Sequence, residues 1–136
     1  MATMTFINLP VKDLSRTTDF FNALGFEFDP VFTDENGTRM IISEDTSAML
    51  IVEPFFKSFI EPHEIADTSK SREVIVGLSA DSRERVDDLT DKALAAGAQS
   101  LGDADDQGFM YMRGFRDLDG HQWSFIWMDM SAVPED

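Results

Sequence analysis

An internal repeat is the feature of this sequence that most restricts its fold. Each half of the chain reads as strand, helix, strand, strand, strand, and corresponding strands lie about 70 residues apart. The opening strands centre near Ile7 and Val76, and the closing strands centre near Ile51 and Ser124. A unit of this size can bury its helix only against its own sheet, whereas two units can curl their sheets around a shared space. The sequence therefore predicts an α+β fold in which two βαβββ repeats form a curled mixed sheet around a cleft.

The helices of both repeats are marked at their ends. Asp13 and Ser82 each precede an apolar stripe at helical spacing and can accept hydrogen bonds from free backbone amides. Gly25 and Gly97 follow the stripes and can adopt the left-handed conformation that ends a helix. We expect strands at residues 4–9, 26–32, 38–43 and 48–53 in the first repeat, and at 73–79, 98–101, 109–115 and 122–128 in the second.

These elements define one domain over residues 1–136. Repeat one covers residues 4–53 and repeat two covers residues 73–128, followed by a short C-terminal tail. Residues 54–72 lack a clean period and include Phe55, Phe56, Phe59 and His63, so they are predicted to form a loop. Loops of this length inside small domains are usually functional or mobile.

Charge and composition exclude several classes of partner. The chain has 26 acidic and 11 basic side chains, which gives a formal net charge of −15. Such a surface repels phosphate backbones and anionic lipid, so neither nucleic acid nor membrane is expected as a partner. The absence of cysteine removes disulfides, thiolate metal sites and cysteine nucleophiles. The N-terminus has no basic region ahead of an apolar block, so we expect no secretory signal and a cytoplasmic location.

Three short motifs accompany the repeat: LPVKDL at residues 9–14, FFNALGF at 20–26 and DLDGH at 117–121. Together with the duplication, they make the chain resemble the vicinal oxygen chelate superfamily from about Thr5 to Asp129. This superfamily contains glyoxalase I, bleomycin-resistance proteins, fosfomycin-resistance enzymes and extradiol dioxygenases. The resemblance implies the glyoxalase/bleomycin-resistance/dioxygenase fold. It does not specify an activity, because one scaffold hosts many chemistries.

The resemblance also implies where a divalent metal would be held. Enzymes of this family take a His or a similar residue from the first strand of each repeat and a Glu from the last strand. In this chain the corresponding positions fall on Phe6, Ile51, Ile75 and Ser124. Phe and Ile have no lone pair, and one Ser hydroxyl is a poor ligand for a divalent ion. We therefore expect neither a bound metal nor another cofactor.

Alternation along the strands predicts which side chains contact a ligand. If the four metal-ligand positions face the cleft, the large apolar side chains of the opposite face, including Trp123 and Trp127, pack beneath the helices. The cleft is then apolar with a few polar groups, which suits a small organic molecule. The predicted contacts are Phe6, Asn8, Met49, Ile51, Ile75, Tyr111, Arg113 and Ser124.

The sequence leaves three hypotheses about function open. The first is a metal-free protein that binds a small hydrophobic or aromatic molecule, as bleomycin-type resistance proteins do by sequestration. The second is a metal-dependent lyase, isomerase or dioxygenase with displaced ligands such as Glu53, Glu73 and His63. The third is a non-catalytic interaction module whose aromatic loop docks a partner. A homodimer is also expected, because Phe55, Phe56 and Phe59 would be costly as an exposed patch.

Overall fold

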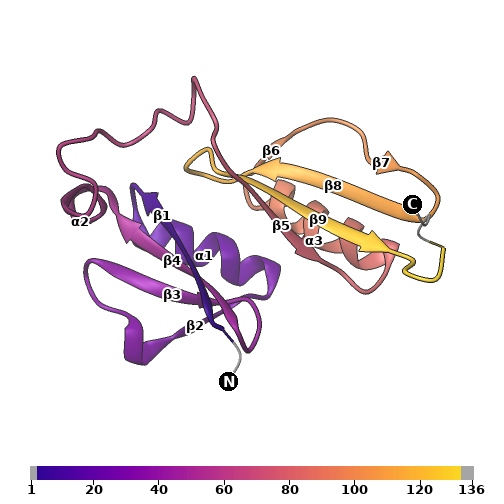
Figure 1. Cartoon of the computed structure of the whole chain (residues 1–136), viewed down its shortest axis with the longest axis horizontal. Helices are drawn as coiled ribbons and strands as arrows, with labels where there is room; N and C mark the ends of the chain where they lie inside the picture. Colours follow the sequence, from indigo (N-terminus) through magenta and orange to yellow (C-terminus); the bar gives the residue numbers. More distant parts are fainter. Residues whose placement is uncertain (1–2, 133–136) are drawn as a thin grey trace. The chain divides into compact units, whose positions relative to one another are not determined.

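The structure is a computed structural model, and it describes residues 3–132 (Figure 1). The chain divides into two compact units, Met1–Asp67 and Thr68–Asp136, which we call the N-terminal and C-terminal units. Each unit contains one predicted repeat with its own mixed sheet, which confirms the α+β class. Within residues 3–132, no helix has the length and apolar character needed to cross a membrane. The end of the predicted tail, residues 133–136, lies outside the described residues.

The N-terminal unit follows the predicted order of one strand, one helix and three strands (Figure 1). Its strands pair in the order β1-β4-β3-β2, with β1 parallel to β4 and the other pairs antiparallel. This order puts β1 and β2 at opposite edges of the sheet and makes them run in the same direction, which requires a crossover connection such as the helix between them. The elements are β1 (Thr5–Val11), α1 (Leu14–Leu24), β2 (Glu27–Asp29), the 3-10 helix η1 (Pro30–Phe32), β3 (Gly37–Ile41), β4 (Thr46–Val52) and α2 (Glu53–Ser58).

Helix α1 begins and ends where the sequence predicts. The Asp13 carboxylate accepts a hydrogen bond from Arg16 N at 3.0 Å, and Gly25 ends the helix with a φ of 102°. The apolar stripe of α1 packs against the sheet face that carries Leu9 and Leu50, both of them buried. The side chains that alternate with these two therefore point to the other face of the sheet.

All four strands of the N-terminal unit differ from the predicted ranges, and the differences are most informative for β1 and β2. Strand β1 continues through Pro10 to Val11, because β1 lies at the edge of its sheet, where proline is tolerated. The second strand ends at Asp29 instead of Phe32. The Asp29 carboxylate accepts a hydrogen bond from Val31 N at 2.9 Å and so caps η1 in place of a continued strand.

A short helix replaces the start of the loop predicted at residues 54–72. Helix α2 carries Pro54 in its first turn, where no backbone N–H is needed. It brings Phe55 and Phe59 into edge-to-face contact, with ring centres 5.0 Å apart and ring planes at 81°. The loop prediction is therefore wrong for residues 54–58. A helix of six residues is too short to reveal itself through an apolar period.

The C-terminal unit repeats the same architecture with one additional strand. Strand β9 lies between β5 and β8, running parallel to β5 and antiparallel to β8, and β6 and β7 pair with β8. Strand β7 was not predicted, and it has only two residues. The elements are β5 (Ile75–Ser79), α3 (Arg83–Ala95), β6 (Gln99–Ser100), β7 (Asp105–Asp106), β8 (Met110–Arg116) and β9 (Gln122–Met128).

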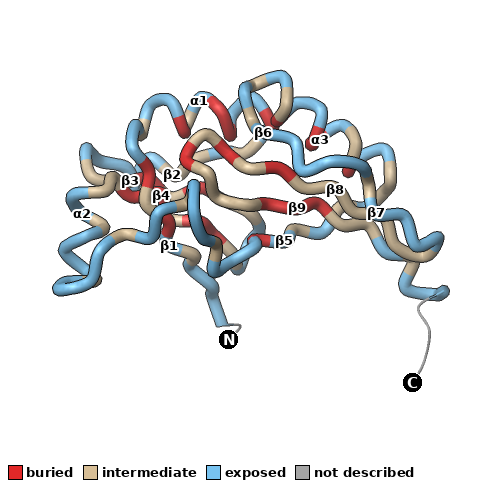
Figure 2. Tube along the Cα trace, turned by 90° about the horizontal axis from the view of Figure 1, so that it is seen from above, coloured by how far each residue is buried: buried red, intermediate tan, exposed pale blue. Residues whose placement is uncertain are grey.

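The core of the C-terminal unit lies between α3 and one face of its sheet. Figure 2 shows buried positions on α3 and along β8 and β9. Val86 of α3, Trp123 and Phe125 are all at most 1% exposed, so the predicted core role of Trp123 is confirmed. Trp127 is half-buried instead, with the Arg83 guanidinium 5.1 Å from its ring centre.

A buried carboxylate holds the turn between β8 and β9. Gly120 N donates to the Asp117 carbonyl at 3.0 Å, which confirms the predicted turn. The Asp117 side chain accepts hydrogen bonds from Asp119 N at 2.9 Å, His121 N at 3.0 Å and Trp123 Nε1 at 2.9 Å. Burial raises the pKa of Asp117, although His121 and these three donors favour the charged form.

Candidate functional site

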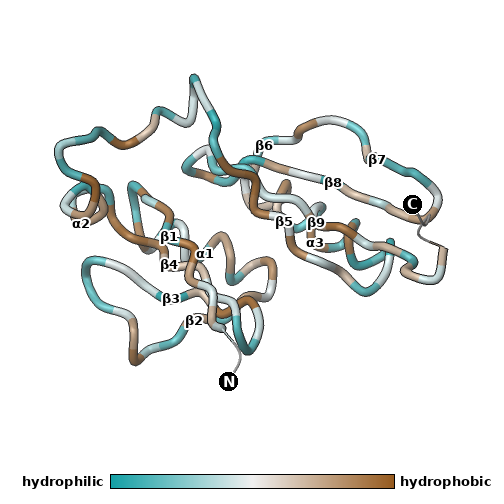
Figure 3. Tube along the Cα trace, in the orientation of Figure 1, coloured by the Kyte–Doolittle hydropathy of each residue, from teal (hydrophilic) through white to brown (hydrophobic). Residues whose placement is uncertain are grey.

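A cavity of about 720 Å³ opens in the N-terminal unit, on the sheet face opposite α1. We call it the N-terminal pocket. Strands β1, β3 and β4 contribute Asn8, Gly37, Met49 and Ile51, and Figure 3 shows the apolar character of β1 and β4. The other apolar side chains of the lining come from η1, α2 and the residues after α2: Val31, Phe32, Phe55, Phe56, Phe59 and Ile60.

Strands β3 and β4 approach each other closely on the sheet side of the N-terminal pocket. Ile51 is only 7% exposed, although it belongs to the face that does not pack on α1. Gly37 starts β3 beside it, and a Cβ at that position would lie 3.0 Å from the Leu50 carbonyl and 3.5 Å from Ile51 Cγ1. The glycine therefore allows the strands to approach closely under the pocket.

Four polar side chains line the same pocket: Asn8, Thr33, Asp34 and Asn36. Asn8 Nδ2 donates to the Phe6 carbonyl at 3.3 Å. Thr33 Oγ1 donates to the Asp29 carbonyl at 2.7 Å, which fixes the chain as it leaves η1. The pocket thus combines a mainly apolar wall with a few convergent hydrogen-bonding groups, as small-molecule sites do.

The structure places three of the predicted contact residues in the N-terminal pocket, namely Asn8, Met49 and Ile51. Phe6 lies on the same face of β1, is 49% exposed and has the Arg39 guanidinium 5.8 Å from its ring centre. It does not line the pocket. All four residues therefore lie on the sheet face that strand alternation predicts. Of the four, only Asn8, Met49 and Ile51 line the pocket on that face.

A second cavity, of about 190 Å³, lies within the C-terminal unit. Ile75, Arg113 and Ser124, three further predicted contacts, are part of its lining. Ile75 is 60% exposed, whereas Ser124 is 6% exposed. The sequence predicts that Ile75, Arg113 and Ser124 contact the same ligand as Asn8, Met49 and Ile51, and this stays a prediction.

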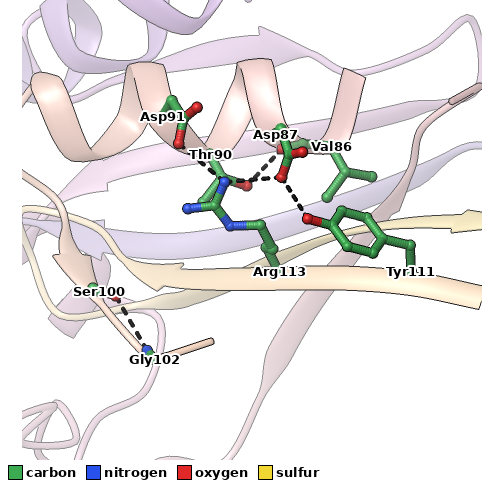
Figure 4. Close-up of polar contacts among 8 residues, drawn as sticks. All are labelled: Val86, Asp87, Thr90, Asp91, Ser100, Gly102, Tyr111 and Arg113. Carbon is green, nitrogen blue, oxygen red and sulfur yellow. Dashed lines mark hydrogen bonds and ion pairs between the residues drawn. The ribbon is translucent and has the colours of Figure 1, made fainter. Parts of the chain in front are cut away.

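Tyr111 and Arg113 require a correction. Their side chains point toward α3, not toward the sheet face that carries Ser124 (Figure 4). Tyr111 Oη donates to Asp87 at 2.7 Å, and Arg113 Nη1 donates to Asp87 and Asp91 at 3.0 Å each. The bond to Asp87, together with burial, raises the pKa of the Tyr111 phenol. These side chains therefore join the sheet to α3. Arg113 belongs to the lining of the second cavity, but its guanidinium is paired with α3, so neither Tyr111 nor Arg113 is part of the ligand site proposed below.

The sequence pattern does not indicate the pocket residues that come from η1 and its following loop, above all Phe32 and Asp34. An extended strand through residue 32 would have carried them away from the sheet face, whereas η1 turns them into the pocket lining. Phe55 and Phe59 were noted as an aromatic cluster but were not assigned to the site. Their spacing of four residues, which puts two side chains on one helix face, was the available signal.

The positions that the family resemblance assigns to metal ligands do not fit a divalent ion. Phe6, Ile51 and Ile75 offer only hydrocarbon, and the Ser124 hydroxyl is a weak donor. In the part of the chain that the structure describes, no three His, Asp or Glu side chains gather as a metal site would need. Glu53, a proposed displaced ligand, lies 4.0 Å from Lys12 Nζ.

Comparisons with known proteins agree with the fold. The family model of the glyoxalase/bleomycin resistance protein/dioxygenase superfamily matches residues 3–125. A hypothetical protein from S. aureus is 27% identical, with a TM-score of 0.78 over 93% of this chain and 94% of that chain. A search of curated proteins gave no significant match.

Two more distant solved structures share the fold. A glyoxalase/bleomycin resistance protein/dioxygenase family enzyme from Burkholderia phytofirmans is 15% identical, with a TM-score of 0.76 over 94% of this chain and 100% of that chain. The fosfomycin resistance protein FosX from Listeria monocytogenes is 19% identical, with a TM-score of 0.67 over 96% of this chain and 97% of that chain. At such identities the likeness concerns the scaffold and not the chemistry.

Proposed function

Because the chain belongs to the glyoxalase/bleomycin resistance protein/dioxygenase superfamily, we propose that it uses this scaffold to bind a small organic molecule in the N-terminal pocket without a divalent metal. The observation that carries this proposal is the pocket itself, with about 720 Å³ of space and an apolar, aromatic lining. Pockets for drug-sized molecules have volumes of roughly 300–1,000 Å³ and linings of this kind.

The lining supports binding more than catalysis. The amides of Asn8 and Asn36 and the hydroxyl of Thr33 are not acid–base groups at neutral pH, but they can orient a ligand through hydrogen bonds. Asp34 is the one carboxylate among the described residues of the lining. The metal-ligand positions of the family, Phe6 and Ile51 in this unit, supply hydrocarbon surface instead. Burial of an apolar ligand against such surface is favourable without help from an ion.

The expected homodimer stays a prediction. Phe55 is 40% exposed and Phe59 is 67% exposed, so both retain apolar surface that a ligand or a second copy of the chain would cover.

Partly filling the N-terminal pocket is expected to weaken ligand binding about tenfold or more. Met49 is half-buried in the lining, and the indole of Met49→Trp would occupy part of the cavity. The neutral aromatic para-tert-butylphenol serves as the probe, with an expected dissociation constant of order 0.1–1 mM for a molecule of its size. Ligand-observed NMR should show that Met49→Trp binds the probe at least about tenfold more weakly than the wild type, because the indole would overlap with the space that the probe occupies.

The matched control is Met128→Trp, at a 44%-exposed methionine in β9 that does not line the pocket. It should bind the probe as the wild type does, and thermal melts of both variants would show that they fold. Wild-type affinity in a folded Met49→Trp variant would contradict the proposed site.

A further inference from the structure

One carboxylate is held at the N-terminal pocket by the loop between η1 and β3. Asp34 Oδ1 accepts hydrogen bonds from Asn36 N at 2.8 Å and Gly37 N at 3.2 Å. The backbone closes the same turn, because Asp34 N donates to the Gly37 carbonyl at 3.0 Å. These bonds fix the position of the carboxylate while using only one of its two oxygens. Within residues 3–132 no hydrogen bond to the second oxygen is found, and Asp34 is exposed, so this oxygen can be reached by a ligand.

The charge of Asp34 is not balanced within the pocket. Among the described residues that form the lining, Asp34 is the only charged side chain. The cation beside the pocket, Arg39, lies 5.6 Å from the Phe32 ring centre but is already paired with Asp29 at 3.2 Å. The negative charge at this wall would therefore repel an anionic ligand and attract a cationic one.

Three exposed phenyl rings also belong to the lining. Phe32 is 55% exposed, Phe55 is 40% exposed and Phe59 is 67% exposed, and all three belong to the lining. The faces of such rings attract cations electrostatically, and Phe32 already does so with Arg39. A fixed carboxylate together with several phenyl rings is the combination that recognises an organic ammonium ion.

We propose that the N-terminal pocket selects small aromatic cations, with Asp34 as the counter-ion and the phenyl rings of η1 and α2 as the surface that covers the apolar part. This inference rests on the proposed function and adds the charge class of its ligand. The probes are two molecules of nearly the same shape, para-tert-butylphenol and its cationic isostere para-hydroxyphenyl-trimethylammonium. They differ in charge and hardly in size.

The experiment compares both probes on three proteins at one ionic strength: wild type, Asp34→Asn and Glu35→Gln. Asparagine keeps the oxygen that accepts from Asn36 N and removes only the charge. Glu35 is an exposed neighbour that does not line the pocket, so Glu35→Gln is a control with the same change in net charge. The wild type and Glu35→Gln should bind the cation about fivefold or more tightly than the neutral probe, and Asp34→Asn should lose this preference.

Equal affinity of the wild type for both probes would overturn the inference and leave the proposed function standing. An equal loss of preference in Glu35→Gln and Asp34→Asn would also overturn it, because general surface charge would then explain the effect. Failure of both probes to bind would instead contradict the proposed function.

Discussion

Replacing Asp117 by alanine is expected to lower the free energy of unfolding by about 3 kcal/mol or more, since each buried donor that loses its partner costs about 1–3 kcal/mol. The Asp117 carboxylate is 7% exposed and accepts from two backbone amides and from Trp123 Nε1. Trp123 is fully buried, so its indole N–H would have no water to replace the carboxylate. Chemical denaturation monitored by circular dichroism measures the change.

Asparagine at this position tests whether the carboxylate is needed as an acceptor on both oxygens. Oδ1 of Asp117 serves the two amides and Oδ2 serves Trp123, so in either orientation an asparagine NH₂ group would face an N–H donor. Asp117→Asn should therefore also be destabilised, by about 1–3 kcal/mol. In a Trp123→Phe background, which lacks the indole donor, the same substitution should cost less. Equal costs in both backgrounds would show that the indole bond contributes nothing.

Replacing Gly120 by alanine is expected to cost about 3 kcal/mol, from a strained backbone together with overpacking. Gly120 has a φ of +86°, and a Cβ there would overlap Thr68 Oγ1 and lie 2.8 Å from Thr68 Cβ. Thr68 cannot retreat freely, because its hydroxyl donates to the Asp119 carbonyl at 2.7 Å. Arg72 donates to the Gly120 carbonyl and to the Thr68 carbonyl, which holds the same segment in place.

Gly102 provides the matched control for this prediction. Its φ is +104°, but no atom lies within 4 Å of a Cβ built there. Gly102→Ala should therefore cost only the backbone strain, about 1–2 kcal/mol. The difference between the two variants in denaturation measurements isolates the clash with Thr68. The extra cost of Gly120→Ala should become smaller in a Thr68→Gly background. Equal stability of Gly120→Ala and Gly102→Ala would refute the predicted clash with Thr68.

The sequence predicts best those elements whose ends are marked by a capping residue, a glycine or a turn. Helix α3 begins after Ser82, whose side chain accepts from Arg85 N at 3.0 Å, and Gly97 follows its end with a φ of 109°. Strand β9 has the predicted bounds because it follows directly after the turn at residues 117–120 and is rich in aromatic and other apolar side chains, which favour a strand. Local chemistry decides these elements, so a single sequence is enough to find them.

The side-chain direction of Tyr111 and Arg113 depends on pairing that the sequence does not reveal. In the antiparallel pair of β8 and β9, Tyr111 lies opposite Trp127 and Arg113 lies opposite Phe125. Opposite residues share a face, so both point to the α3 side with these aromatics. Had the register been known, the assignment of Trp127 and Phe125 to the helix side would have placed Tyr111 and Arg113 there as well.

The walls of the N-terminal pocket were the hardest part to predict. Its sheet side follows from strand alternation, but η1 has only three residues, capped by Asp29, and α2 has only six, with Pro54 in its first turn. Such turns are short, and they bend the chain without leaving a period in the sequence. Phe32 and Phe59 therefore become pocket residues only once the fold is known.

The most direct test of the central claim is an amide NMR titration of isotope-labelled protein with para-tert-butylphenol after treatment with EDTA. Metal-free organic binding predicts saturable shifts at Asn8, Met49 and Ile51 and along α2, with the same affinity before and after the chelator. Shifts that appear only when manganese or zinc is added back, or that avoid these residues, would contradict it.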